Sequence, residues 1–206
     1  QTLMAAKLGL QATVEAAAPQ STTPQSTTPQ SPIPQSPIPQ PVPPQTLALM
    51  NDLLQLLAQE RVDYPLFWRT LSRAVAQGIP AAMPQPAGGD CLLAWQRVCD
   101  LFIDQAAIAS WLAQYQSALQ AGVAGKPYTD WACRQVGEAM LKVNPKFVLR
   151  NHMAQTAIVQ AQDKDFGEVA RLLRVLQTPF DEHPDCEDLA LAPPAWAAQL
   201  HLSCSS

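Results

Sequence analysis

Apolar residues recur every three or four positions between residues 46 and 178, and this spacing constrains the fold more than any other feature. Residues 46–60 are typical, because Leu47, Met50, Leu53 and Leu57 fall on one helical face and such a stripe packs against a core. No segment alternates apolar and polar residues as a half-buried strand would. The sequence therefore predicts an all-α fold, with helices at 46–60, 64–77, 91–104, 106–121, 130–142, 144–162 and 165–176, and a short turn at 194–200.

A proline-rich repeat separates this helical region from the first residues. From Pro19 the chain reads PQSTT twice, PQSPI twice and then PQPVP. Proline fixes φ and lacks an amide hydrogen, which favours extended polyproline II structure. We expect residues 11–45 to form a disordered or polyproline linker, a spacer rather than a ligand for a proline-binding groove. Residues 1–10 should end a helix at Gly9, residues 46–178 form the helical domain, and residues 179–206 form an irregular tail.

Charge and hydropathy exclude two classes of partner. The 206 residues carry a formal net charge of −4, whereas a protein that binds the phosphate backbone normally presents a basic stripe. No uncharged apolar run is long enough to cross a bilayer. We expect neither a nucleic-acid nor a membrane partner.

The five cysteines form no C-x-x-C pair, and their odd number indicates a reducing compartment. Cys91, Cys99 and Cys133 lie beside apolar residues, so we expect them to be small buried hydrophobes. Cys204 lies near the end of the chain, where termini are usually accessible. Its thiol is the candidate redox residue of this sequence.

Other polar clusters favour structural roles over chemical ones. His183 with Cys186 and His201 with Cys204 form two H-x-x-C units, which could supply a zinc shell, but the order of ligands is unusual and Pro193-Pro194 lies between them. A run of acidic residues lacks the ligand spacing and central glycine of a calcium loop, and we expect a solvated turn. The run comprises Asp181, Glu182, Asp185, Glu187 and Asp188.

The clearest helix start is at Asn144-Pro145, since asparagine is a preferred N-cap residue and proline is tolerated at N1. Arg150 and Asn151 follow within an otherwise apolar stretch. They could clamp a substrate, or they could satisfy carbonyls and a carboxylate at a helix junction, and the second role is favoured. The residues that we expect to be buried along this helix are Phe147, Val148, Met153, Ile158 and Val159.

Residues 143–151, VNPKFVLRN, resemble the NPKYVLRN block of the selenoprotein O (YdiU) family. Further blocks resemble the family in the same order, and together they cover nearly all of the chain except the repeat. They are MAAKLGL at 4–10, DYPLFWRTLS at 63–72, DFGEV at 165–169, PFDE at 179–182, PPAWA at 193–197 and SCSS at 203–206.

The resemblance implies a protein-kinase-like fold, a pseudokinase that binds ATP in an inverted pose and transfers AMP to protein hydroxyls with Mg²⁺ or Mn²⁺. This chain resembles only the C-terminal portion of the family, and the nucleotide-binding parts belong upstream of the KLGL segment. We therefore assign no catalytic, cofactor-binding or metal-binding residue here, and expect the chain to be inactive alone. Cys204 matches the family's terminal redox position, whose expected disulfide partner lies in the catalytic half.

The resemblance also implies partners and a compartment. The partners are the missing N-terminal catalytic half and the protein substrates of the complete enzyme. The compartment is the cytoplasm for a bacterial protein, or the mitochondrion for a eukaryotic one. The alternatives are a non-catalytic helical interaction module from a truncated or split paralogue and, third, a small module stabilised by zinc at the H-x-x-C units. Helices that lack their catalytic partner should expose apolar surface.

Overall fold

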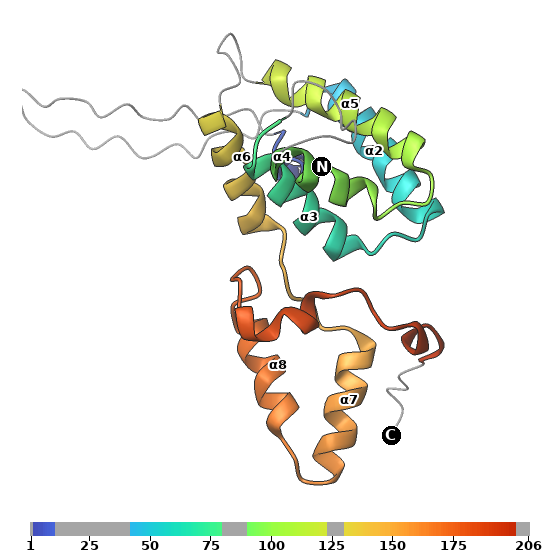
Figure 1. Ribbon diagram of the computed structural model, residues 1–206, viewed down its shortest axis with the longest axis vertical. Helices are drawn as coiled ribbons and strands as arrows, with labels where there is room; N and C mark the ends of the chain where they lie inside the picture. Colours follow the sequence, from blue (N-terminus) through green and yellow to red (C-terminus); the bar gives the residue numbers. More distant parts are fainter. Residues whose placement is uncertain (1, 11–41, 80–89, 123–129, 201–206) are drawn as a thin grey trace, which may run out of the picture.

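The computed structural model describes residues 2–10, 42–79, 90–122 and 130–200, and helices are the only regular elements in these ranges. The all-α prediction is confirmed for this part of the chain. Figure 1 shows a bundle above a separate helical hairpin. The bundle contains α1 (Thr2–Lys7), α2 (Pro44–Gln59), α3 (Tyr64–Ala76), α4 (Asp90–Cys99), α5 (Gln105–Gly122) and α6 (Asp130–Val143). The hairpin contains α7 (Asn151–Gln162) and α8 (Gly167–Gln177), followed by the 3₁₀ segments η1 (Pro184–Ala190) and η2 (Ala195–Gln199).

Helix α3 organises the bundle, because it packs against both α4 and α6 while α2 packs against α5. The core contains several large aromatic side chains. The indole of Trp95 donates a hydrogen bond to Gly78 O at 2.8 Å, and the indole of Trp111 donates to Leu49 O at 2.9 Å. These bonds satisfy the polar edge of each buried indole. The fully buried residues around them include Leu8, Leu53, Phe67, Leu71, Ile108, Leu112 and Met140.

The short helix α1 belongs to this core although residues 11–41 separate it from α2. Leu8 is completely buried, and Tyr115 donates a hydrogen bond from its hydroxyl to Leu8 O at 2.7 Å. Gly9 ends the helix with φ +65°, a conformation that glycine adopts without a steric cost. The predicted helix stop at Gly9 is confirmed. The proline-rich repeat lies outside the described residues.

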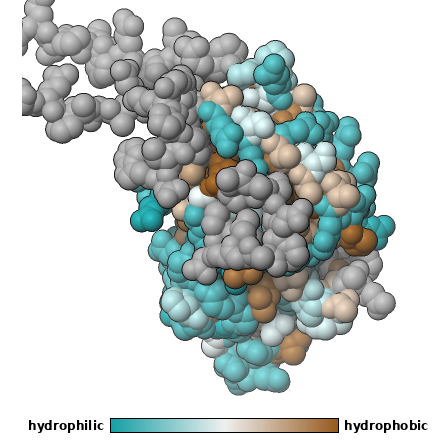
Figure 2. All heavy atoms as spheres, turned by 45° about the horizontal axis from the view of Figure 1, so that its top comes forward, coloured by the Kyte–Doolittle hydropathy of each residue, from teal (hydrophilic) through white to brown (hydrophobic). Residues whose placement is uncertain are grey.

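The hairpin has a second, smaller core. It is formed by Phe147, Met153, Ala157, Leu172, Val175, Cys186 and Leu189, which come from α7, α8, η1 and the link before α7. Of the residues predicted to be buried here, Phe147 and Met153 are buried. The prediction is wrong for Val148, Ile158 and Val159, which are 37%, 49% and 48% exposed. Apolar side chains also interrupt the polar surface in the space-filling view (Figure 2).

The predicted helix start at Asn144 is wrong. The backbone amide of Asn144 donates to Met140 O at 2.9 Å, which continues the bonding of α6, and α7 begins only at Asn151. Between these helices the chain is a non-helical link. The amides of Lys146 and Phe147 donate to Pro179 O at 2.8 and 3.1 Å. Because those amides bond a distant carbonyl, the link gains a hydrogen-bond partner without becoming helical.

Smaller differences concern helix ends. Helix α4 ends at Cys99 rather than at residue 104, and η1 lies in a tail that was predicted to be irregular. The predicted turn near 194–200 is confirmed by η2, where Trp196 packs edge-to-face against His152 with ring centroids 6.0 Å apart. None of the described helices is both long and apolar enough to cross a membrane.

Candidate functional site

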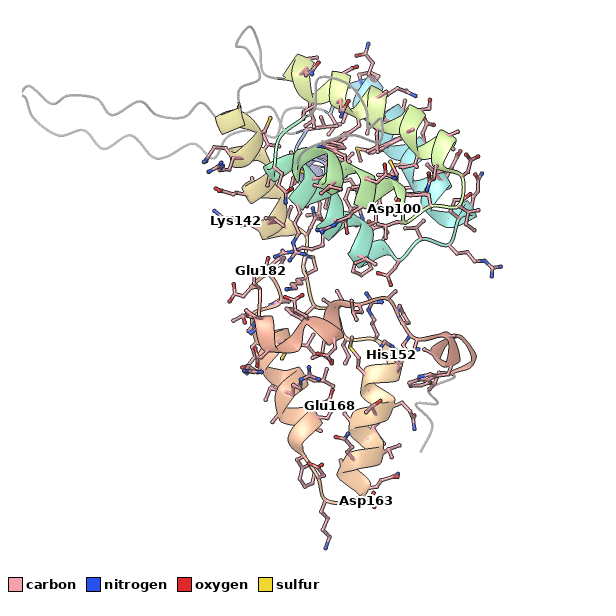
Figure 3. The ribbon with its side chains drawn as sticks, viewed as in Figure 1. Asp100, Lys142, His152, Asp163, Glu168 and Glu182 are labelled. Atoms are coloured by element: carbon pink, nitrogen blue, oxygen red, sulfur yellow. The ribbon has the colours of Figure 1, made fainter. Side chains whose placement is uncertain are left out.

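The bundle and the hairpin are joined by a cluster of polar side chains, which we call the polar junction. It consists of Lys7, Arg69, Ser72, Asn144, Lys146 and Glu182. Figure 3 shows Glu182 between the lower end of the bundle and the top of the hairpin. Most of these side chains are buried, and buried polar groups are costly unless they are hydrogen-bonded. Their partners therefore reveal what the junction does.

Asn144 of the junction is completely buried, as is Ser72. Its side-chain oxygen accepts a hydrogen bond from the Lys7 ammonium at 3.0 Å. Its side-chain nitrogen donates to Lys7 O at 3.1 Å and to the Ser72 hydroxyl at 2.9 Å. One amide thus connects the end of α1, the middle of α3 and the end of α6. This use of its side chain explains why Asn144 does not cap a following helix.

Arg69 reaches from α3 to two other segments, the end of α6 and the chain at 180–182. Its Nη1 donates to Leu141 O and to Asn144 O, both at 3.0 Å. Its Nη2 donates to Phe180 O at 3.0 Å and to a Glu182 carboxylate oxygen at 2.7 Å. Because a guanidinium presents its donors in a rigid fork, this one residue fixes the position of the chain at 180–182 against the end of α6.

Glu182 forms ion pairs with three cationic side chains. Arg69 and Arg73 pair with its carboxylate at 2.7 and 2.5 Å, and the ammonium of Lys146 pairs with it at 2.9 Å. Lys146 is also paired with Glu187. Partial burial would raise the pKa of Glu182, but the hydrogen bonds from Lys146 and Arg69 and the charge of Arg73 outweigh burial and lower the pKa to about 2. Glu182 therefore stays ionised at neutral pH.

A second contact connects the link before α7 to the bundle. Arg150 holds the carboxylate of Asp63 with two hydrogen bonds, at 2.5 and 3.0 Å. Asp63 also caps α3, because its Oδ1 accepts a hydrogen bond from the amide of Leu66 at 2.9 Å. The predicted structural role of Arg150 at a helix junction is confirmed. Asn151 is the first residue of α7 and is exposed.

The acidic residues of the turn at 181–188 are exposed, as the solvated turn predicted from the sequence requires, but several of them are also ion-paired. Arg171 pairs with Asp188 and Arg174 pairs with Asp185, so two residues of α8 hold η1 in place. Hydrogen bonds from these arginines lower the pKa of Asp185 and of Asp188. Together with Glu182 and Glu187, these carboxylates fix the tail to the rest of the chain.

Of the candidate metal and redox residues, only His183 and Cys186 lie in the part of the chain that the structure describes. The His183 ring contacts Thr178 and Phe147, whereas the completely buried Cys186 accepts a hydrogen bond from Arg174 at 3.1 Å. Within the described ranges no three His, Cys, Asp or Glu side chains are grouped as metal ligands. His201 and Cys204 lie outside these ranges. Cys99 and Cys133 are buried, as predicted, whereas the side chain of Cys91 is outside the described part of the structure.

The polar junction connects segments that lie far apart in the sequence. Sequence reasoning identified Arg150 as a junction residue but interpreted Asn144 as a helix cap. It missed Lys7, Arg69 and Ser72 as partners of Asn144, and Asp63 as the partner of Arg150. One signal was present: Arg69 and Ser72 lie on the apolar face of α3, which is buried. Polar residues on a buried face need partners, although the sequence does not say which ones.

Comparison with known proteins shows which family the chain belongs to. The family model described as "Protein adenylyltransferase SelO" matches residues 1–177. A protein nucleotidyltransferase YdiU from Cupriavidus metallidurans is 46% identical over 164 residues, which is 79% of this chain and 26% of that protein. YdiU proteins from Cupriavidus pinatubonensis and Albidiferax ferrireducens are 46% and 41% identical over 77% of this chain. The chain spans about a quarter of the length of these curated relatives. It belongs to the SelO protein adenylyltransferase family.

Proposed function

We propose that this chain is the C-terminal helical region of a SelO-type protein adenylyltransferase, an enzyme that transfers AMP from ATP to Ser, Thr or Tyr hydroxyls of proteins. One observation carries the proposal: a match to the family across residues 1–177 that corresponds to about a quarter of the relatives' length. The kinase-like fold, the ATP site and the Mg²⁺ or Mn²⁺ site then belong to the remaining three-quarters.

The contacts of the polar junction support a scaffolding role for this region. Arg69, Asn144 and Lys146 are the kinds of residue that could bind a phosphate or a carboxylate, yet each is buried and bonded to other parts of the chain. Residues held in this way position segments and are not free for substrate. On this proposal the region stabilises the catalytic part, and Cys204 supplies a regulatory thiol to a cytoplasmic enzyme.

The test is a chimera in which this chain replaces the matching quarter of the Cupriavidus metallidurans relative. The measurement is transfer of labelled AMP from ATP to protein. We expect the chimera to label protein, and we expect no labelling by this chain alone or by the relative without its matching quarter. Labelling by the isolated chain would contradict the proposal. A folded but inactive chimera would favour the alternative, a non-catalytic helical interaction module.

A further inference from the structure

The bundle and the hairpin are joined by polar contacts, whereas each has an apolar core of its own. Among the described residues, the two cores have no residue in common. Helices α7 and α8 pack principally against each other, and the hairpin lies below the bundle as a separate body in Figure 1. Parts of a chain that meet without a large apolar interface are expected to move relative to each other.

The first connection between the two parts is made by Glu182. Arg69 and Arg73 of α3 pair with its carboxylate at 2.7 and 2.5 Å, and Arg69 also donates to Phe180 O at 3.0 Å. We call these contacts the Glu182 latch. The Glu182 side chain is 52% exposed, so water and dissolved ions compete for its partners and the latch can open without unfolding either core.

The second connection is the ion pair between Asp63 and Arg150, which we call the Asp63 latch. Asp63 is the N-cap residue of α3, and Arg150 is the N-cap residue of α7. The guanidinium donates two hydrogen bonds to the carboxylate, at 2.5 and 3.0 Å. Both latches therefore fasten the hairpin to the same helix of the bundle, α3.

The backbone passes from the bundle to the hairpin at Pro145. The residue before it, Asn144, is fixed to the bundle, because its side chain bonds α1 and α3 and its amide continues α6. The residue after it, Lys146, is fixed to the hairpin side. Its amide donates to Pro179 O at 2.8 Å, just beyond α8, and its ammonium pairs with Glu187 of η1. Pro145 is the one residue between these two anchors.

We propose that the hairpin is a hinged unit that pivots at Pro145 and is held closed against the bundle by the Glu182 and Asp63 latches. Opening both latches frees the hairpin to swing while the bonds of Asn144 and Lys146 keep each side of the hinge intact. The proline ring fixes φ at the pivot and restricts the residue before it to extended conformations. These restrictions limit the arc of the swing and guide the hairpin back to its latches.

The experiment measures residual dipolar couplings of backbone amides by NMR on the full 206-residue chain. The couplings of α2, α3 and α5 and those of α7 and α8 are fitted separately, which shows whether each part is folded and whether both are aligned as one body. The latch variant is Asp63→Asn with Glu182→Gln, since asparagine keeps an acceptor for the helix cap. The matched control is Asp185→Asn with Asp188→Asn. It also neutralises two carboxylates that are paired with arginines, but both of these pairs lie within the hairpin.

We expect the wild type and the control to fit one alignment tensor. In the latch variant the hairpin should have a separate tensor that is smaller than that of the bundle by about twofold or more, because hinge motion on the microsecond to millisecond scale averages its couplings. Adding Pro145→Gly to the latch variant should reduce the hairpin tensor further, since glycine removes the restriction on φ.

One shared tensor in the latch variant would overturn the inference, because the hairpin would then be held without its latches. Separate tensors in the wild type or in the control would overturn it as well. So would a latch variant in which either part no longer fits its own structure, since a hinged unit stays folded when it opens. An unchanged hairpin tensor after Pro145→Gly would refute the placement of the pivot.

Discussion

At the scale of single residues, Glu182 determines how firmly the tail is held. It is the only acidic residue in the described ranges for which three separate ion pairs, to Arg69, Arg73 and Lys146, are recorded. Arg69 and Lys146 are buried, so they lose a partner that water cannot replace if the carboxylate is removed. The carboxylate itself is half exposed, which screens part of each attraction.

The substitution Glu182→Gln should therefore lower the free energy of unfolding at pH 7 by about 1 kcal/mol, measured by urea unfolding. The pKa of Glu182 is lowered to about 2 from 4.5. A carboxyl with a lowered pKa stabilises the fold above its unfolded pKa and loses that contribution as the pH falls towards its folded pKa. The difference between wild type and variant should thus shrink between pH 5 and pH 2. A difference that stays constant over this range would contradict the assignment.

The carboxylate of Asp63 makes two interactions, the N-cap of α3 and the ion pair with Arg150. Two substitutions of Asp63 can separate the contribution of each interaction to stability. Asp63→Asn keeps an N-cap acceptor but removes the charge, whereas Asp63→Ala removes both. We expect Asp63→Ala to destabilise by about 2 kcal/mol and Asp63→Asn by about half of that. Urea unfolding of both variants in wild-type and Arg150→Gln backgrounds measures the coupling. A coupling of zero in this double-mutant cycle would rule out a contribution from the ion pair.

At the scale of helices, the contact of α3 with α6 depends on a position without a side chain. A Cβ at Gly137 would lie 2.3 Å from the Ala76 amide nitrogen and 2.5 Å from its Cβ. Backbone cannot move aside as a flexible side chain does, so α6 would have to shift away from α3. This steric conflict exceeds the gain in helix propensity from glycine to alanine.

We expect Gly137→Ala to lower the free energy of unfolding by about 2 kcal/mol. Gly167→Ala is the matched control, because a Cβ there would meet only Asp165 Oδ1, at 3.1 Å, in the first turn of α8. The control should be neutral or slightly stabilising in the same thermal and urea measurements. If Gly137→Ala were equally harmless, the two helices would not be in close contact.

The helices also show which features of the fold local sequence signals can predict. Apolar spacing was sufficient to predict α2, α3, α5 and α6 to within two or three residues at each end, because each buries a continuous face. The signal at Asn144-Pro145 failed for a physical reason. The side chain of Asn144 bonds Lys7 and Ser72, which are 137 and 72 positions away, and these contacts outweigh a local preference for a helix cap.

The same limit applies to burial and to the site. Ile158 and Val159 were predicted to be buried because α7 is apolar, but the hairpin has too few neighbours to cover more than one face of α7. Sequence reasoning recognised that Arg150 would bind a carboxylate, but the choice of Asp63 depends on how α3 and α7 are brought together. Pairings between distant segments are decided by tertiary structure, and one sequence does not contain a signal for them.

At the scale of the whole molecule, the two parts differ in how much apolar surface they bury. Among the residues that the structure describes, the bundle core contains 21 buried residues and the hairpin core contains seven. Regions with fewer buried contacts open at lower free energy. Native-state hydrogen exchange should therefore show amides of α7 and α8 exchanging faster than those of α3 and α6. Equal protection of the two parts would mean that the polar junction couples them into one cooperative unit.

The placement of α1 implies that the polypeptide need not be continuous for the bundle to survive. Residues 2–10 are held by Leu8 in the core and by hydrogen bonds from Tyr115 and Asn144 to backbone carbonyls. A protease site engineered between residues 20 and 40 should yield a nicked protein whose two fragments co-elute in gel filtration and separate only in denaturant. The N-terminal peptide would then behave as a non-covalent subunit, and the length of the repeat could vary with little effect on the bundle.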